Sequence, residues 1–298
     1  MKVVTSLNQI PPLEKPIALS IGVYDGVHLG HQAILKNLQK VVKKGGQTAV
    51  LTFSNHPSIY LTPNSPIPLI ISLEHRLKLF EEMGIDLAIV LPFNQSFAAQ
   101  SYEDFFSALK THLPFDNLIV GDDARFGKGR AGGPEEIKRI GIAAYYLQKE
   151  MLGKQPISSK EIRSYIEKGD LKRVKKMLGR PYSLILPYDH QSVIRENDVQ
   201  FKWETGTKKL CLLPSAVYAV DLKANGKTIP AIAFYRSTQT IERETQLSLS
   251  IIYEKPLPAA EMIEVAFIAY LHDELDPELR SPSKRTLLQT LKPELFPS

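Results

Sequence analysis

The segment from Gly22 to His31 combines residue types that could perform chemistry: glycines at positions 22, 26 and 30, and histidines at positions 28 and 31. It stands where an apolar run, Ile17 to Gly22, passes into a helical pattern. Glycine lets the backbone approach a ligand closely, and a helix start offers unpaired N–H groups and a positive dipole to phosphate oxygens. Histidines three residues apart share one helix face. The segment therefore predicts a phosphate site where two imidazoles neutralise charge that develops during an in-line displacement.

Two other segments carry charged or polar groups at positions that fit such a site. Asp123 and Arg125 follow an apolar run, Asn117 to Gly121, and would stand at the carboxyl end of that strand. Ser159 begins a helical pattern whose N–H and hydroxyl groups can bind phosphate, and Arg163 one turn later adds a forked cation. Taken alone, the first segment also fits an ordinary polar turn, and the second fits a simple N-cap beside a solvated arginine.

The hydrophobic pattern from Ile17 to about Gln148 supplies the elements that would position these groups. It alternates between β-rich apolar runs and amphipathic helical patterns, which predicts a parallel sheet covered on both faces. A ligand crevice is then expected beyond the carboxyl ends of the strands. The expected strands are Ile17 to Gly22, Gln47 to Ser54, Asp86 to Pro92, Asn117 to Gly121 and Ile142 to Leu147, and the expected helices lie near 29–44, 72–83 and 101–111.

The pattern changes after Leu147. A capping box at Ser158 and Glu161 predicts a helix that ends at Gly169, and a second basic helix is expected to end at Gly179. Beyond Pro187 the pattern is one of shorter strands, followed by a segment that we expect to be strand first and helix later. These strands are Phe201 to Glu204, Ala216 to Leu222, Ile229 to Tyr235 and Glu244 to Tyr253, with a tight turn at Asn225-Gly226, and the last segment is Met262 to Glu274. We therefore expect two domains, residues 1–184 and a small β-rich domain of residues 185–298 with a C-terminal helix.

Composition excludes several classes of protein. With 298 residues, 43% hydrophobic and 23% charged, the chain has the composition of a compact protein. Its single cysteine, Cys211, excludes a disulfide scaffold and a multi-thiolate zinc site, and makes a reducing cytoplasm the expected location. The longest apolar run, Val265 to Leu271, is seven residues, so neither a signal peptide nor a membrane span is expected.

The charge is concentrated in one segment. Lys and Arg exceed Asp and Glu by five, and residues 160–180 alone carry eight basic and three acidic side chains, so the rest of the chain sums to zero. The charge distribution therefore predicts no basic surface over the whole molecule, and this disfavours general nucleic-acid binding. The basic segment fits either a solvated helix face or a local phosphate site.

The segment from Gly22 to His31 resembles the HxGH signature of the nucleotidyltransferase superfamily, in the G-x-F-D-G-x-H-x-G-H version of the prokaryotic riboflavin kinase/FAD synthetase family. Further segments resemble that family in order and spacing. They are Thr52 to Pro57 (TF-x-x-HP), Arg76 to Asp86, Leu91 to Phe93, Val120 to Gly129 (VGDDFRFG-x-G), Ile157 to Arg163 (ISST-x-IR) and Leu178 to Tyr182. The resemblance implies an α/β fold: a Rossmann-like nucleotidyltransferase domain with a parallel sheet, followed by a β-barrel domain.

The implied reaction joins FMN to ATP, giving FAD and pyrophosphate, with Mg²⁺ on the triphosphate. The resemblance implies that His28 and His31 stabilise the α-phosphate in the transition state and that Ser159 and Arg163 hold ATP phosphates. Asp123 and Arg125 would line the nucleotide side, and His56-Pro57 the flavin side, although a His-Pro turn is often purely structural. The full set of expected ligand-binding residues is Gly22, Tyr24, Asp25, Gly26, Gly30, Phe53, Asn55, His56, Pro57, Asp123, Arg125 and Ser158. No metal ligands are assigned.

The first domain departs from the family pattern at three positions. Tyr24 replaces a phenylalanine, Ala124 replaces an aromatic residue and Lys160 replaces a threonine. The first change is conservative. The other two remove a ring that could stack on a base or flavin and exchange a hydroxyl for a cation, so they bear on affinity rather than on chemistry.

The second domain departs more. In the family it is a riboflavin kinase whose G-x-x-x-GR-x-LGFPTAN segment binds ATP and magnesium, and no such segment lies between Pro187 and Pro214. Segments like the family's strands remain, including Pro214 to Val220 and Ile263 to Glu274, and Glu244 resembles the family's catalytic glutamate. The barrel is therefore expected to be retained while its magnesium and phosphate elements are not, with Glu244 as a kinase remnant.

These observations favour an FMN adenylyltransferase carrying a diverged kinase barrel. The fully bifunctional enzyme, which also phosphorylates riboflavin, stays open as the alternative. A flavin- or nucleotide-binding sensor without catalysis is disfavoured by His28, His31, Ser159 and Arg163, and a tRNA-binding relative of HxGH synthetases is disfavoured because no KMSK-like loop is present. The expected partners are small molecules, ATP and FMN or riboflavin, with no nucleic acid and no membrane; the sequence leaves the oligomeric state open.

Overall fold

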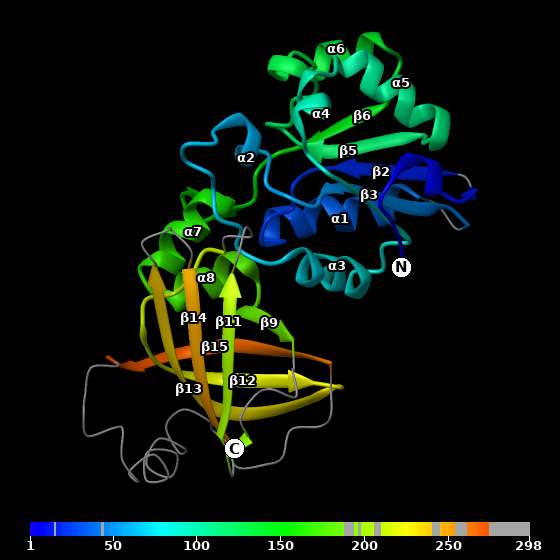
Figure 1. Ribbon diagram of the computed structural model, residues 1–298. Coiled ribbons are helices and arrows are strands. Elements are labelled where there is room, and N and C mark those ends of the chain that lie inside the picture. The colour runs from blue at the N-terminus through cyan, green and yellow to red at the C-terminus, as the bar shows by residue number, and fades with distance from the viewer. Residues whose placement is uncertain are drawn as a thin grey trace. The chain divides into compact units, whose positions relative to one another are not determined.

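The computed structural model describes residues 1–14, 16–42, 45–187, 194–195, 198–205, 210–239, 245–253 and 261–273. The chain divides into two compact units (Figure 1). The first comprises Met1–Pro68 and Leu73–Ser158, and the second comprises Leu69–Ser72 and Ser159–Ser298.

The first unit is built on a parallel sheet, as the sequence predicts. Its described strands pair in the order β1-β4-β3-β2-β5-β6, and every pairing is parallel. The strands are mostly buried because helices cover both faces, which explains their continuous apolar runs. They are β1 (Lys2–Val4), β2 (Ile17–Ile21), β3 (Gln47–Phe53), β4 (Leu87–Leu91), β5 (Asn117–Gly121) and β6 (Ala144–Leu147).

The strand order reverses between β2 and β5. The chain leaves β2 to form β3 and β4 on one side, then crosses back to form β5 and β6 on the other. The loops that follow β2 and β5 therefore lead in opposite directions at the carboxyl edge of the sheet. Such a reversal opens the crevice in which parallel sheets bind ligands.

Helices pack on both sides of this sheet, with α1 and α3 on one face and α5 and α6 on the other (Figure 1). The predicted helices are confirmed, and Ser101 caps α5 through the backbone N–H of Asp104. The described helices of this unit are α1 (Leu29–Val41), α2 (Ser58–Leu61), α3 (Leu73–Glu82), α4 (Gln95–Ala99), α5 (Tyr102–His112) and α6 (Pro134–Arg139), with 3₁₀ turns at Leu7–Gln9 and Lys128–Arg130.

Several short elements were not predicted. Strand β1 pairs with β4 at the edge of the sheet, but it has three residues and only Val4 of these is buried. The segment Met151 to Pro156 forms a small hairpin of β7 (Met151–Leu152) and β8 (Gln155–Pro156). Elements this short leave no hydrophobic period in the sequence.

The second unit contains two helices, α7 (Ser159–Glu167) and α8 (Leu171–Leu178), and an antiparallel sheet. Its described strands pair in the order β10-β11-β14-β13-β12-β15-β9. In Figure 1, β11 and β14 run at a steep angle to β12 and β15, so the sheet curls as expected for the predicted barrel. The strands are β9 (Tyr182–Pro187), β10 (Ile194–Arg195), β11 (Asp198–Thr205), β12 (Ala216–Ala224), β13 (Lys227–Gln239), β14 (Thr245–Tyr253) and β15 (Met262–His272).

The turn between β12 and β13 follows the sequence prediction. Asn225 and Gly226 have φ values of 48° and 74°, the left-handed pair that a two-residue hairpin turn requires. The final segment differs, because β15 remains a strand as far as His272, where the sequence favoured a change to helix. Both the expected C-terminal helix and Glu244 lie outside the described residues.

Along the chain, the first compact unit ends at Ser158 and the second resumes at Ser159, and the sequence predicts the domain boundary at 184 and 185. The difference concerns α7, α8 and the start of β9. Helix α8 buries Val174, Met177 and Leu178 and contacts β9 and β15, so it groups with the antiparallel sheet. None of the helices in the described part of the chain has the length and hydropathy that a bilayer crossing needs.

Candidate active site

The loop Gly22 to His28 joins β2 to α1 at the reversal point of the parallel sheet. His28 is the N-cap residue of α1, with extended backbone angles (φ −71°, ψ 173°), and its Nδ1 accepts the backbone N–H of His31 at 3.4 Å. Because Nδ1 is an acceptor, the neutral ring carries its proton on Nε2, which can donate a hydrogen bond. The helix start and this Nε2–H are both suited to an anion.

The two imidazole rings lie against each other. The centroids of His28 and His31 are 3.6 Å apart and the ring planes differ by 18°. His28 is 6% exposed, and His31 is partly buried. The structure therefore brings the two predicted catalytic histidines together as a stacked pair.

Tyr24 supports this pair from within the core. Its ring centroid is 5.0 Å from that of His31 and 5.3 Å from that of Phe80, which it meets edge-on. Its hydroxyl forms a hydrogen bond with Ser20, and burial raises the pKa of Tyr24 far above its usual value. Ser20 gives the hydroxyl a buried partner, which explains how tyrosine fits where the family pattern has phenylalanine. Tyr24 thus packs beneath His31 with its own polar group engaged.

The glycines of the loop allow close contacts between the backbone and these rings. A Cβ on Gly30 would stand 3.2 Å from Cε1 and Nδ1 of His28, and a Cβ on Gly22 would stand 3.1 Å from the Tyr24 ring. Gly26 has a φ of 84°, which side-chain-bearing residues rarely adopt. Asp25, between them, is 2% exposed.

The predicted residues after β3 have structural partners. Phe53 is buried and packs edge-on against Phe93 at 5.3 Å between ring centroids. The Asn55 amide exchanges two hydrogen bonds of 2.8 Å with the backbone of Phe93, which joins the ends of β3 and β4. His56 Nδ1 accepts the backbone N–H of Ser58 at 3.1 Å, and Pro57 is the N-cap residue of α2. The turn is therefore shaped by local hydrogen bonds.

The loops after β5 and β6 carry cations at the carboxyl edge of the sheet. The Asp123 carboxylate pairs with Lys149 at 2.9 Å, and this hydrogen bond and charge raise the pKa of Lys149. Arg125 donates to the carbonyls of Asp122 (3.1 Å) and Ala124 (2.7 Å), so its guanidinium lies along its own loop. Lys149 was not singled out from the sequence, where a lone lysine after the last strand gives no signal.

The predicted phosphate-binding residues of α7 belong to the second unit. Ser159 is the first residue of the helix and Arg163 lies one turn later, while Ser158 is the last residue of the first unit. Ile162 and Ile166 are buried and fix the face on which α7 packs. Cys211 is also buried, and its Sγ lies 3.6 Å from the carbonyl oxygen of Arg163.

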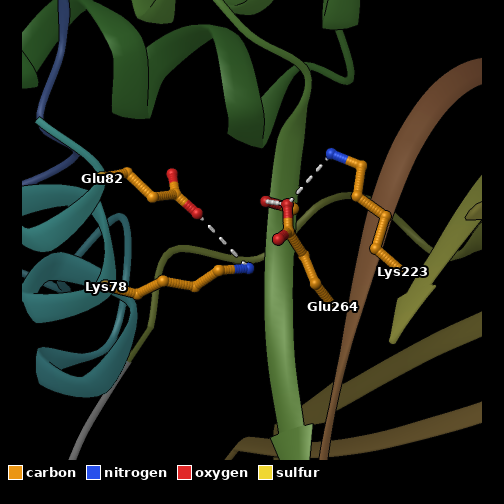
Figure 2. Close-up of polar contacts among 5 residues, drawn as sticks. Lys78, Glu82, Lys223 and Glu264 are labelled. Atoms are coloured by element: carbon orange, nitrogen blue, oxygen red, sulfur yellow. Dashed lines mark hydrogen bonds and ion pairs between the residues drawn. The ribbon is translucent and has the colours of Figure 1, made fainter. Parts of the chain in front are cut away.

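A polar cluster lies on the strands of the second unit. Glu264 Oε1 accepts hydrogen bonds from Ser183 at 3.0 Å and from Lys223 at 3.3 Å (Figure 2). These residues come from three adjacent strands, β15, β9 and β12. On β12, burial raises the pKa of Asp221. This cluster carries no part of the missing kinase segment.

These features define an enzyme of the nucleotidyltransferase class: a parallel sheet whose strand order reverses, a glycine-bearing loop at the point of reversal, and stacked imidazoles at a helix start. The family model for FAD synthetase matches residues 10–164 of the chain. The chain belongs to the FAD synthetase family.

Similar proteins agree with this assignment. The chain is 31% identical over 234 residues to a bifunctional riboflavin kinase/FMN adenylyltransferase of Buchnera aphidicola, covering 74% of this chain and 73% of that protein. A protein of the same description from Escherichia coli K12 is 31% identical over 245 residues, covering 79% and 77%. A crystal structure of a protein named macrolide-efflux protein, from Streptococcus pneumoniae, superposes with a TM-score of 0.75 at 21% identity over 98% of this chain and 96% of that one. The last comparison shows the fold alone.

Proposed function

We propose that the chain transfers AMP from ATP to FMN, giving FAD and pyrophosphate. The observation that carries this proposal is the stacked pair of His28 and His31 at the start of α1, where the strand order of the parallel sheet reverses. The relatives from Buchnera aphidicola and Escherichia coli, which include FMN adenylyltransferase in their names, support the choice of substrates.

In this reaction an oxygen of the FMN phosphate attacks the α-phosphorus of ATP. A new P–O bond forms, the bond from the α-phosphorus to its bridging oxygen breaks, and pyrophosphate leaves with that electron pair. The FMN phosphate is an anion at neutral pH, so no base has to remove a proton. The protein mainly positions two anions and screens their repulsion.

His28 and His31 are proposed to stabilise the α-phosphate as its charge develops. The Nε2–H of His28 and the N-terminal amides of α1 would donate to its oxygens. Two positive rings at a centroid distance of 3.6 Å would repel each other unless an anion lay beside them. The pair is therefore suited to a role in which charge appears only with the substrate.

Cations around the site would hold the triphosphate. Arg125 and Lys149 lie on the loops after β5 and β6, and Lys149 is paired with Asp123 at 2.9 Å. A triphosphate that binds Lys149 would replace this carboxylate as its partner. We further propose that Ser159 and Arg163 hold ATP phosphates and that Asp123 lines the nucleotide side.

The remaining ligand assignments extend the same proposal. Phe53, Asn55 and the His56-Pro57 turn would border the flavin, and Gly22, Gly26 and Gly30 with Tyr24, Asp25 and Ser158 would shape the phosphate loop. Functionally, residues 1–184 would form the adenylyltransferase domain and residues 185–298 the diverged kinase-like domain. The single reduced cysteine fits a proposed cytoplasmic location, with small molecules and no nucleic acid as partners.

Magnesium would enter as part of the ATP complex. Within the described residues, no three His, Cys, Asp or Glu side chains are grouped so that they could hold a metal ion. Magnesium commonly keeps several waters and binds through one or two carboxylates together with substrate phosphates. Asp122 and Asp123 at the end of β5 offer such carboxylates.

The test is to incubate the full chain with ATP, Mg²⁺ and FMN, and to follow FAD by chromatography and pyrophosphate by a coupled assay. Equal amounts of FAD and pyrophosphate are expected. Binding of FMN and ATP without either product would instead identify a flavin- or nucleotide-binding sensor and refute the transferase.

A second candidate function is the full bifunctional enzyme. It is favoured by the names of the relatives, which include riboflavin kinase. Supplying riboflavin in place of FMN distinguishes it, because only a kinase yields FMN from that substrate.

A further inference from the structure

Arg76 is a fully buried cation beside the histidine loop. It projects from α3 and is 0% exposed. Its Nη1 donates to the carbonyl of Val23 and, at 2.8 Å, to the hydroxyl of Thr52. Thr52 in turn donates to the same Val23 carbonyl at 3.2 Å. The three groups form a closed hydrogen-bonded triangle between α3, β3 and the loop.

The loop that Arg76 touches has an unfavourable backbone. Tyr24 has a φ of 53° and Val27 a φ of 39°, a region that β-branched residues almost never occupy. Backbone of this kind persists only where surrounding contacts hold it. Here Arg76 and Thr52 hold the carbonyl of Val23 at one end of the loop, and the Gln32 side chain holds the carbonyl of Val27 at 2.9 Å at the other. His28 follows directly.

A packing role does not account for a cation at this position. Burial lowers the pKa of Arg76 to about 10, against the opposing effect of Asp25 and Glu74, so the guanidinium is still charged at neutral pH. Its Nε and Nη2 meet no hydrogen-bond acceptor among the described residues. A leucine or methionine would fill the same space without this desolvation, and buried ion pairs rarely stabilise more than apolar replacements. The charge and the Nη1 contacts therefore point to a role beyond packing.

We propose that Arg76 is a positioning residue for adenylyl transfer, which fixes the strained loop through Val23 and Thr52 and so sets the placement of His28 and His31. This inference rests on the proposed function. Asp25 of the same loop, 2% exposed, supplies a negative charge that acts on Arg76. The guanidinium thus ties the loop both by hydrogen bonds and by charge, without touching the reacting phosphates.

The first test compares two substitutions on α3. Arg76→Met removes the guanidinium at similar length. Lys78→Met is the matched control, because Lys78 is an exposed lysine that forms an ion pair with Glu82, 3.8 Å away on the same helix (Figure 2). We expect Arg76→Met to lower kcat for FAD formation by about tenfold or more, with KM for ATP and FMN within about twofold of the wild type. Lys78→Met should leave both parameters unchanged.

Two more conservative substitutions keep the inference testable if Arg76→Met does not fold. Thr52→Val keeps the shape of the side chain but removes the hydroxyl that bonds both Arg76 and Val23, leaving only their direct hydrogen bond, and should lower kcat several-fold. Arg76→Lys keeps a charge and a donor, and should recover much of the kcat that Arg76→Met loses. A purely structural role would predict changes that follow the thermal stability of each variant instead.

A spectroscopic measurement separates this inference from the proposed function. Imidazole ¹H–¹⁵N spectra of the full chain report the stacked rings directly, whether or not FAD is formed. We expect the signals of His28 and His31 to shift in Thr52→Val and Arg76→Lys, and to stay in place in Lys78→Met.

The outcomes are distinct. A wild type that forms no FAD refutes the proposed function, while shifted histidine signals still support a positioning role. Wild-type kcat and unshifted signals in a folded Arg76→Met, or in Thr52→Val if the former does not fold, overturn the inference.

Discussion

The stacked rings of His28 and His31 make different contacts in the free protein. His28 caps α1 through Nδ1, whereas His31 packs on Tyr24 with a centroid distance of 5.0 Å. Loss of the His28 ring therefore removes a helix cap as well as the proposed transition-state donor. Loss of the His31 ring removes the other proposed donor and an aromatic contact but leaves the cap residue in place.

We predict that His28→Ala and His31→Ala each lower FMN adenylylation by at least about tenfold, the scale of a lost transition-state contact. His28→Ala should also lower the free energy of unfolding by about 1 kcal/mol, because alanine does not cap a helix. His28→Asn separates the effects, since asparagine caps well but has no imidazole. Turnover and denaturant unfolding measure the two quantities.

The control for these variants is His112→Ala, a change of an exposed histidine at the end of α5. It should alter neither turnover nor stability. Wild-type turnover in both histidine variants of the loop would remove their catalytic assignment, and activity in His28→Asn equal to wild type would reduce His28 to a cap.

Gly30 offers a test in which stability and activity move in opposite directions. Alanine at this position in α1 should favour the helix by up to about 1 kcal/mol. Its Cβ, however, would stand 3.2 Å from the ring of His28 and push that ring aside. We predict that Gly30→Ala keeps or raises the melting temperature while turnover falls about threefold to tenfold. Unchanged turnover would show that the ring tolerates displacement.

The sequence predicts His28 and His31 because their spacing, the glycines beside them and their place between a strand and a helix all fall within one short segment. The sequence does not predict that Arg76 contacts the loop that carries these histidines. Arg76 lies 45 or more positions after these histidines in the chain, and a basic residue on an amphipathic helix normally faces solvent. Only the fold brings the guanidinium to the carbonyl of Val23. Contacts of this kind depend on tertiary packing and leave no local pattern.

At the scale of elements, the loop after β5 depends on glycine. Gly127 has a φ of 70°, and a Cβ there would stand 2.4 Å from the backbone nitrogen of Tyr102. Gly129 has a similar φ of 64° but open space around it. The two positions therefore separate the cost of backbone conformation from the cost of a steric clash, within one loop.

We predict that Gly127→Ala lowers the free energy of unfolding by about 2 to 4 kcal/mol, and that Gly129→Ala lowers it by about 1 kcal/mol. The difference arises because the first substitution must displace the backbone at the start of α5, whereas the second meets only the left-handed φ. Urea unfolding followed by circular dichroism measures both. Equal values for the two variants would mean that α5 moves without cost.

The elements themselves differ in how well the sequence predicts them. The buried strands β2 to β5 form continuous apolar runs, since helices cover both faces of the sheet, and the sequence finds each of them. Strand β1 has one buried residue, Val4, and gains its structure by pairing with β4. Strand β15 contains charged positions such as Glu264, which cross-strand partners satisfy and which resemble a helical mixture in the sequence.

At the scale of the whole molecule, the two units diverge from the family to different degrees. The parallel unit carries most of the ordered motifs, from Gly22 to Gly129, and the FAD synthetase model matches residues 10–164. The antiparallel unit keeps strands that resemble the family's barrel, but the sequence between Pro187 and Pro214 lacks the two glycines and the Pro-Thr-Ala-Asn run of the kinase segment. A fold can persist when its ligand-binding groups are replaced, because packing of the strands does not need them.

We therefore predict that the chain makes FAD from FMN but forms no FMN from riboflavin. A kinase has to hold magnesium and the triphosphate beside the riboflavin hydroxyl, and the segment whose threonine and asparagine do so in the family is missing from the sequence between Pro187 and Pro214. Chromatography of parallel reactions with riboflavin or FMN, each with ATP and Mg²⁺, measures both activities in one preparation, with FMN as the positive control. Accumulation of FMN or FAD from riboflavin would show that other groups bind the metal and that the enzyme is bifunctional.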